Sequence, residues 1–191
     1  HTAVGHKVKT PFEFVASSAR ALRTTNATGG LTAATDGYSF ASPLQRMGEM
    51  LLFDRAAPDG YPEVADPWIS GGTLVERIRY IQGLLNSSTG DDAGNNVADP
   101  VALLKKKLAS NNWNNAGAVA DYFLSILFPT EGAGNLLLYR TAAINFLNSD
   151  DAGGSTASTQ FNLQANTGTT YDTRVRGMVS LLLTLKRFNE Q

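Results

Sequence analysis

Three short motifs that begin helices constrain the fold of this chain more than any other feature. Thr10-Pro11-Phe12-Glu13 has the residues of a capping box with proline at the first helical position, and Ser42-Pro43 and Asp99-Pro100 repeat the cap and the proline. A capping side chain accepts a hydrogen bond from a backbone N–H of the first turn, and proline lacks only an N–H that has no helical partner there. The sequence therefore predicts helices that begin at residues 11, 43 and 100.

Apolar residues recur every three or four positions along seven segments, which is the period of an amphipathic helix. These segments span about residues 11–26, 43–53, 74–85, 100–108, 116–128, 135–147 and 175–188. Sustained strand alternation is absent from the sequence, and Thr156–Leu163, within the polar segment 155–170, is the one weak strand candidate. We expect an all-α fold: a compact bundle of about seven helices with long loops rich in Ser, Thr, Asn and Gly, forming a single domain over residues 1–191.

The third of these segments has a clear predicted orientation. Leu74, Ile78, Ile81 and Leu85 have the spacing of one buried stripe. We therefore expect the charged Glu76, Arg77 and Arg79 on the other faces of this helix.

Composition excludes several classes of function. The 191 residues are 42% hydrophobic, enough for a core, and the net charge of −1 gives no basic excess to hold a phosphate backbone, so we expect no nucleic-acid partner. The chain has no cysteine, which excludes disulfides, thiolate nucleophiles and cysteine-based zinc sites. The sequence has no apolar run long enough for a membrane span. It also has no phosphate-binding, nucleophile-elbow or zincin motif, so we expect no cofactor.

Metal binding has only weak support in the sequence. His1 and His6 precede the first predicted helix and have no positioned partner, so neither a triad nor a metal site is expected from them. Asp91, Asp92 and Asp99 offer oxygen ligands of the kind that calcium prefers, but their spacing is not that of an EF-hand. A solvated loop is the preferred interpretation, and Asp99 already has a role as a helix cap.

The stretch APDGYPEVADPWISGGTL, residues 57–74, allows two interpretations. Its prolines and glycines suit two tight turns, so that Tyr61 and Trp68 would pin an elbow between helices to the core. Alternatively, Tyr61 and Trp68 bind a sugar beside the carboxylates of a polysaccharide hydrolase. The acidic residues for that role are Asp59 and Glu63, with Asp54 and Asp66 nearby. We favour the elbow, and with it a chain that is not an enzyme.

Two sequons are candidate sites of N-glycosylation. They are Asn26-Ala27-Thr28 and Asn86-Ser87-Ser88. Both are predicted at helix ends or in loops, where an attached sugar would reach solvent.

Several blocks along the chain resemble the bacterial family catalogued as domain of unknown function 1800. In sequence order the blocks are Lys7-Val8-Lys9-Thr10-Pro11-Phe12-Glu13-Phe14-Val15, Arg20-Ala21-Leu22, Met47-Gly48, Pro58–Pro62, Trp68–Leu74 with Arg77, and Arg174–Gln191. Two features depart from the pattern: Glu49 stands where glutamine is frequent, and the Asn-rich stretch 111–115 has no counterpart. The resemblance implies a helical, exported protein, of which this chain is the C-terminal part, and it transfers no catalytic residues.

These observations together predict an exported or cell-surface helical module with a structural or interaction role. We expect it to self-associate or bind other surface proteins, and to associate with glycan. The alternative is the polysaccharide-directed hydrolase with its acidic and aromatic site around residues 54–68.

Overall fold

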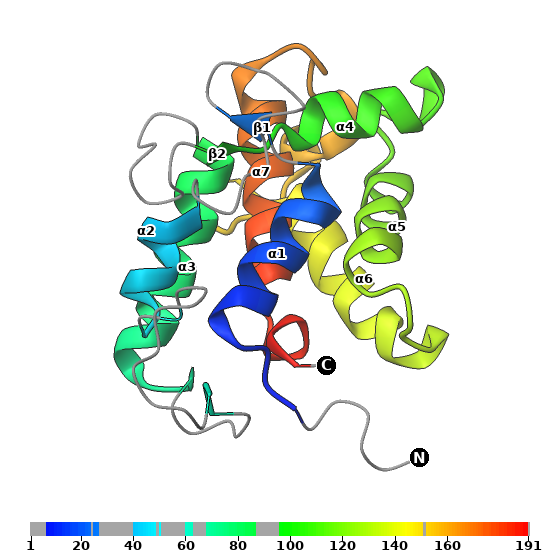
Figure 1. Ribbon diagram of the computed structural model, residues 1–191. Helices are drawn as coiled ribbons and strands as arrows, with labels where there is room; N and C mark the ends of the chain where they lie inside the picture. Colours follow the sequence, from blue (N-terminus) through cyan, green and yellow to red (C-terminus); the bar gives the residue numbers. More distant parts are fainter. Residues whose placement is uncertain are drawn as a thin grey trace. The chain divides into compact units, whose positions relative to one another are not determined.

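The computed structural model describes residues 7–23, 25–26, 40–48, 50, 60–62, 68–86, 96–150 and 152–190. Seven α-helices and one pair of two-residue strands lie in these ranges, which confirms the all-α prediction (Figure 1). The chain divides into two compact units, each described by itself below. Unit 1 comprises His1–Ala98 and Thr184–Gln191, and unit 2 comprises Asp99–Leu183.

Unit 1 contains three helices, a strand pair and the last short helix of the chain. Their bounds are Pro11–Leu22 for α1, Ala41–Arg46 for α2, Gly71–Asn86 for α3, Thr25–Asn26 for β1, Asn96–Val97 for β2 and Lys186–Asn189 for the 3₁₀ helix η7. Helix α2 packs against α1 and α3, and β1 pairs antiparallel with β2. Val8 forms an antiparallel bridge with Glu190, so the first and last described segments lie side by side.

Helix α1 begins as its capping box predicts. Thr10 Oγ1 accepts a hydrogen bond from the Glu13 backbone N–H over 3.3 Å, and the Thr10 N–H donates to Glu13 Oε2 over 2.7 Å. The helix ends earlier than predicted, because Arg23 adopts a left-handed conformation with φ 49°. Its buried face carries Phe14 and Val15, whereas Phe12, predicted on that face, is exposed.

Helix α2 does not begin at the second predicted cap, Ser42. The helix begins at Ala41, so Ser42 lies inside its first turn and Phe40 occupies the cap position without a side-chain hydrogen bond. Ser42 Oγ instead accepts from Arg46 Nη1 one turn later, over 3.0 Å. The predicted extension of this helix to residue 53 falls largely outside the described residues, and the described helix ends at Arg46.

Helix α3 buries a different face from the predicted one. Ser70 accepts from the Thr73 N–H and its own N–H donates to Thr73 Oγ1, so this pair caps the helix as expected. Of the predicted stripe, Ile81 and Leu85 are buried, but Leu74 and Ile78 are exposed. Arg77, predicted on another face than the buried stripe, is only 2% exposed. The prediction was wrong because the first two turns of α3 turn their apolar side outward.

Four aromatic rings run through the interior of unit 1. Phe14 lies edge-on to Tyr80 with 6.1 Å between ring centroids, and to Phe188 with 5.9 Å. Phe40 contacts Tyr80 from the other side. Edge-to-face pairs of this kind add stability beyond the burial of their area, and here they join residues from four separate segments.

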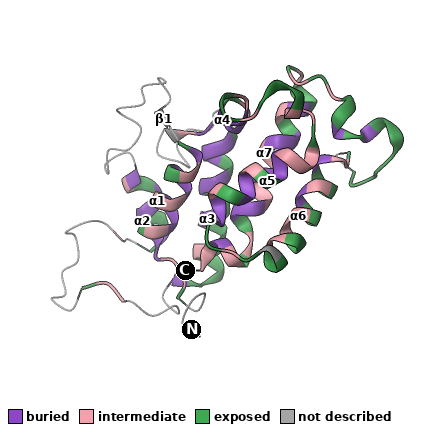
Figure 2. Ribbon diagram, turned by 90° about the vertical axis from the view of Figure 1, so that its right-hand side faces the viewer, coloured by how far each residue is buried: buried purple, intermediate pink, exposed green. Residues whose placement is uncertain are grey.

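Unit 2 contains the remaining helices. Their bounds are Pro100–Lys107 for α4, Ala116–Leu127 for α5, Ala133–Leu147 for α6 and Thr169–Thr184 for α7, whose last residue is assigned to unit 1. Asp99 caps α4 as predicted, accepting from the Ala102 N–H over 3.0 Å. Asn115 caps α5 in the same way, and α5 packs along α6. Figure 2 shows α6 as a mostly exposed helix, on which only Ala143 and Leu147 are buried among its described side chains.

The polar segment before α7 is not a strand. Thr156–Leu163, the weak strand candidate, forms two short 3₁₀ helices, Ala157–Thr159 and Phe161–Leu163. Thr156 and Thr159 exchange hydrogen bonds across the first turn, and the Phe161 ring stacks on Tyr171 at 4.8 Å. The segment is therefore held by local polar contacts and one buried ring, and α7 begins at Thr169 rather than near residue 175.

Candidate functional site

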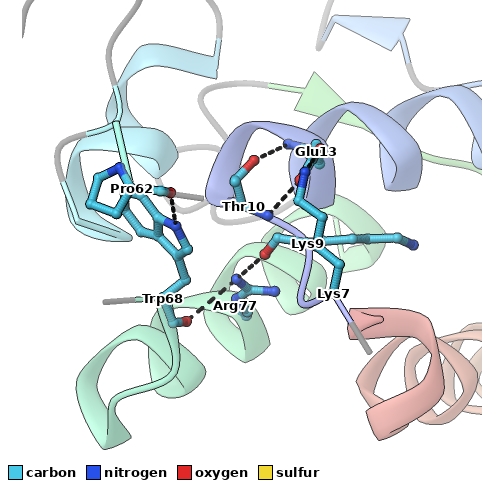
Figure 3. Close-up of polar contacts among 7 residues, drawn as sticks. All are labelled: Lys7, Lys9, Thr10, Glu13, Pro62, Trp68 and Arg77. Carbon is cyan, nitrogen blue, oxygen red and sulfur yellow. Dashed lines mark hydrogen bonds and ion pairs between the residues drawn. The ribbon is translucent and has the colours of Figure 1, made fainter. Parts of the chain in front are cut away.

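The described part of the elbow places its tryptophan inside unit 1. Trp68 is 3% exposed, and its Nε1–H donates to the Pro62 carbonyl over 2.8 Å (Figure 3). Tyr61 is half-buried, and its ring centroid lies 6.4 Å from that of Trp68. The indole is thus enclosed by the protein and has little surface left for stacking on a sugar.

Gly48 lies against the same indole. Its φ is +115°, a conformation that residues with a Cβ rarely adopt, and a Cβ at this position would lie 3.3 Å from Trp68 Cζ3. Met47 beside it is completely buried. This geometry gives a physical reason for the Met47-Gly48 pair: one side chain fills the interior while the next residue leaves room for the indole.

Arg77 connects three segments that are distant in sequence. Its Nη2 donates to the backbone carbonyl oxygens of Lys9, at 2.7 Å, and Trp68, at 3.4 Å (Figure 3). Its Nη1 donates to Asn189 Oδ1 over 2.9 Å. One side chain therefore holds together the approach to α1, the end of the elbow and the C-terminal 3₁₀ helix.

Arg77 and Lys9 form a small cationic cluster in unit 1. Among the described residues no carboxylate lies within ion-pair distance of Arg77, and its Nε has no hydrogen-bond partner. Burial lowers the pKa of Arg77 to about 10. Burial, and then repulsion from Arg77, lower the pKa of Lys9 to about 8 against the attraction of Glu13. Both cations rest on aromatic faces, Arg77 on Phe14 and Lys9 on Phe188.

A pocket of about 560 Å³ opens beside this cluster. Its apolar lining comes from Val8, Ile69 and Leu74, and Arg77 and Thr184 contribute to its wall. The 3₁₀ helix η7 and its flank add Lys186, Asn189 and Glu190. Glu190 lies near two cations, with Lys186 Nζ 3.5 Å from its Oε1 and Arg187 Nη1 3.7 Å from its Oε2.

An exposed apolar surface adjoins the pocket. It consists of Ile69, Leu74, Val75 and Ile78, which are 40–48% exposed, and we call it the α3 apolar face. Leu74, Val75 and Ile78 are one, three and four positions apart and so share one side of the helix. Ile69 and Leu74 also line the pocket, so the pocket and the face form one continuous apolar area.

The predicted catalytic and metal residues are mostly outside the described part of the chain. Asp59, Glu63, Asp91 and Asp92 lie there, as do Asp54 and Asp66. Asp99 serves as the α4 cap and lies 3.5 Å from Arg176. Over the residues that the structure describes, no three His, Cys, Asp or Glu side chains gather in a way that suits a metal ion.

The two predicted glycosylation sites lie in different settings. Asn86 is the last residue of α3 and is exposed. Asn26 belongs to β1, where it pairs with Asn96. Within the described ranges, no helix combines the length and apolar composition that a bilayer crossing requires.

Arg77 is the principal residue that the sequence analysis placed wrongly. One signal for its position was available: Arg77, Tyr80, Ile81 and Leu84 are spaced three, four and seven apart, so the arginine shares a face with three large residues. All four are buried.

Comparison with protein families matches residues 1–189 to the family described as "Protein of unknown function (DUF1800)". A search of curated proteins found no match, and neither did a search of solved structures.

Proposed function

Because this chain belongs to the DUF1800 family, which is defined without an activity, we propose its function from its own surfaces: an interaction module that self-associates. The observation that carries this proposal is the α3 apolar face. Four large apolar side chains lie together on the surface of unit 1, beside an apolar pocket. Contiguous exposed apolar area of this kind is typical of protein–protein contact sites.

A second copy of the chain is the partner that fits this surface best. The net charge of −1 creates almost no long-range repulsion between copies. The surroundings of the face carry both signs: Arg79 pairs with Glu76 at 2.7 Å, and Lys186 lies near Glu190. In a two-fold dimer the same patch meets itself, so a mixed border lets opposite charges face each other.

The family resemblance supports an exported or cell-surface location for this module, since typical members carry an export signal. Glycan association is the second part of the proposed role. The hydrolase alternative receives no support from the described residues, because Asp59 and Glu63 lie outside them and Trp68 is enclosed. It stays a prediction, and we place the interaction role first.

Light scattering across a range of protein concentrations tests self-association. Val75→Lys and Ile78→Lys put a charge on the α3 apolar face at side chains that are already exposed, so the fold should persist. We expect the wild type to form oligomers and both variants to stay monomeric. Leu138→Lys is the matched control, since Leu138 is an exposed apolar residue of α6 in the other unit.

Two results would oppose the proposal. A wild-type chain that is monomeric at every concentration removes self-association. If Leu138→Lys abolishes oligomers while Val75→Lys does not, the interface is on α6 and the α3 apolar face is not the contact surface.

A further inference from the structure

Unit 2 contains an open pocket whose wall is built mainly from carboxamide side chains. It has a volume of about 420 Å³, within the size range of small-molecule sites. Six amides line it: Asn111, Asn114, Asn115, Asn148, Gln160 and Asn162. The first two residues of α5, Ala116 and Gly117, complete the lining, so no charged side chain contributes. We call this the amide pocket.

Three of the six amides are fixed by bonds to the protein. Asn148 Oδ1 accepts from the Phe161 N–H over 2.9 Å, and its Nδ2 donates to the Ile144 carbonyl over 3.0 Å. Asn114 Nδ2 donates to the Gln164 carbonyl, and Asn115 Oδ1 accepts from Ala118 N as the α5 cap. These bonds tie the segment before α5, the end of α6 and the turns before α7 into one rigid frame.

The other three amides keep their full hydrogen-bonding capacity. Asn111, Gln160 and Asn162 are exposed, and their side chains make no hydrogen bond to any described residue. Asn115 Nδ2 is likewise uncommitted, since only the Oδ1 of that amide is engaged. Each free carboxamide offers an acceptor oxygen and a donor NH₂ group. The pocket therefore presents both kinds of partner from a fixed frame, which reduces the ordering cost of binding.

Arg140, which lies close to the pocket residue Gly117, does not change this neutral character. Arg140 approaches Gly117 so closely that a Cβ there would lie 2.9 Å from Arg140 Nη2. Its guanidinium, however, binds Asp121 through two hydrogen bonds, Nε to Oδ1 at 2.6 Å and Nη2 to Oδ2 at 3.2 Å. This partner raises the pKa of Arg140 and balances its charge.

We propose that the amide pocket binds a neutral carbohydrate, with the hydroxyl groups of one or two sugar residues held by Asn111, Asn115, Gln160 and Asn162. A hydroxyl donates and accepts at once, which matches a carboxamide on both sides. An anionic or cationic ligand would find no opposite charge in the lining, and an apolar one would leave the amides without partners. No aromatic ring lines the pocket, so stacking adds nothing and we expect binding to a single sugar unit to be weak.

This inference rests on the glycan-associated role proposed above and gives that role a site. It also accounts for the Asn-rich stretch 111–115, because that stretch forms one wall. The other wall comes from residues 148–162, so the sequence alone did not reveal the site.

Titration of the full chain followed by two-dimensional NMR tests the proposal, because side-chain NH₂ groups of Asn and Gln give their own signals. The probes are neutral trisaccharides of β-1,4-linked glucose and of β-1,4-linked N-acetylglucosamine, with trigalacturonate as the anionic probe. We expect a neutral probe to shift the NH₂ signals of Asn111, Gln160 and Asn162, with affinity unchanged by 0.5 M salt (roughly the level at which surface charges are screened). Trigalacturonate should leave these signals in place.

Variants separate this site from other surfaces. Asn111→Leu, Gln160→Met and Asn162→Leu keep the approximate shape of each side chain and remove its polar atoms. Because these side chains are exposed and unbonded, the fold should be retained, and we expect each variant to bind the neutral probe at least about fivefold more weakly, roughly the loss of one hydrogen bond. Asn145→Leu, an exposed asparagine of α6 outside the pocket, is the matched control and should bind as the wild type does.

Three results would overturn the proposal: no shift of the pocket amides with either neutral probe, shifts confined to other surfaces, or binding of trigalacturonate alone. Light scattering on the same samples distinguishes this outcome from failure of the interaction role. A chain that forms oligomers but leaves the pocket amides unshifted contradicts only the carbohydrate site, and a monomer that binds the neutral probe contradicts only self-association.

Discussion

Arg77 Nη2 donates a hydrogen bond to the backbone carbonyl oxygen of Lys9, 68 residues earlier in the chain, over 2.7 Å. The same side chain also bonds Trp68 and Asn189. No carboxylate of the described residues pairs with this buried guanidinium, and the cost of burying its charge is offset by hydrogen bonds to oxygen atoms and by the face of Phe14. The balance between these effects decides how stable unit 1 is.

Replacing Arg77 by methionine tests that balance. Arg77→Met removes the donors to the Lys9 carbonyl and to Asn189 Oδ1, which are both partly buried, and a fully buried acceptor left without a donor costs about 1–3 kcal/mol. Loss of the unpaired charge offsets part of this, so we expect the free energy of unfolding to fall by about 1–3 kcal/mol in urea denaturation. Arg79→Met, an exposed arginine on the same helix, should change it by less than about 1 kcal/mol. A more stable Arg77→Met chain would mean that the cost of burying the charge exceeds the hydrogen bonds.

The lowered pKa of Lys9 predicts a dependence of stability on pH. It is about 8 in the folded chain against an ordinary value of 10.5. Between pH 8 and 10.5 the unfolded chain holds a proton on Lys9 that the folded chain has lost, so Lys9 makes the stability of the fold rise with pH. Below pH 8 Lys9 is protonated in both states, and the cost of burying its charge destabilises the fold. Lys9→Met should therefore raise the melting temperature at pH 7, and its advantage should shrink by pH 9.5.

Other titrating groups set the controls for that measurement. Arg77, Glu13 and Arg187 act electrostatically on Lys9, and because the pKa of Arg77 is itself about 10, its own titration begins at the upper end of this range. Burial raises the pKa of Tyr80 well above its usual value, which makes stability fall with pH only above about pH 10. Lys7→Met, at a lysine on the surface, should show no comparable change between pH 7 and 9.5. An advantage of Lys9→Met that is equal at both pH values would contradict the prediction.

Gly48 and Gly60 form a matched pair for substitution by alanine. Both have positive φ, +115° and +74°, so alanine strains the backbone at each. At Gly48 the new Cβ also meets the Trp68 ring at 3.3 Å, whereas at Gly60 nothing lies within 4 Å. We expect Gly60→Ala to cost about 1 kcal/mol and Gly48→Ala about 2–3 kcal/mol. A shifted Trp68 fluorescence spectrum only in Gly48→Ala would confirm the contact, and equal costs would exclude it.

Thr10→Ala removes the side-chain half of the α1 capping box. The N–H of Glu13 then loses its acceptor, and we expect a loss of about 1 kcal/mol of stability. Ser17→Ala, on the same helix, deletes a hydroxyl that bonds only the Phe14 carbonyl of its own turn and should be close to neutral. Thermal denaturation of both variants makes the comparison, and a Thr10→Ala chain as stable as Ser17→Ala would show that the box is dispensable.

Local signals in the sequence predicted local structure well. The caps at Thr10 and Asp99 were placed correctly because each acts on a backbone N–H three residues away. Ser42-Pro43 has the same pattern of a capping residue and a proline, yet α2 begins at Ala41, two residues earlier than predicted, because proline is also tolerated later in a first turn and the serine bonds Arg46 instead. A capping residue followed by proline therefore predicts where a helix begins only to within a residue or two.

Long-range contacts explain what the sequence could not show. Arg77 is buried because Lys9, Trp68 and Asn189 surround it with oxygen acceptors, and two of these three are far from it in sequence. The amide pocket likewise joins residues 111–117 to residues 148–162. The spacing of Arg77 with Tyr80, Ile81 and Leu84 indicates its buried face, but it does not indicate which acceptors surround it. The two walls of the amide pocket leave no spacing pattern, since they depend on where the chain returns in space.

The antiparallel bridge between Val8 and Glu190 has a mechanical consequence. Because the segments around Val8 and Glu190 are paired antiparallel, tension applied to the chain before Val8 and after Glu190 would separate them one hydrogen bond at a time and not in shear. The hydrogen bond from the Lys9 N–H to the Asn189 carbonyl would break early. The hydrogen bonds of Arg77 to the Lys9 carbonyl and to Asn189 Oδ1 would then hold the two segments together. Tension applied at these two points would therefore act first on this corner of unit 1.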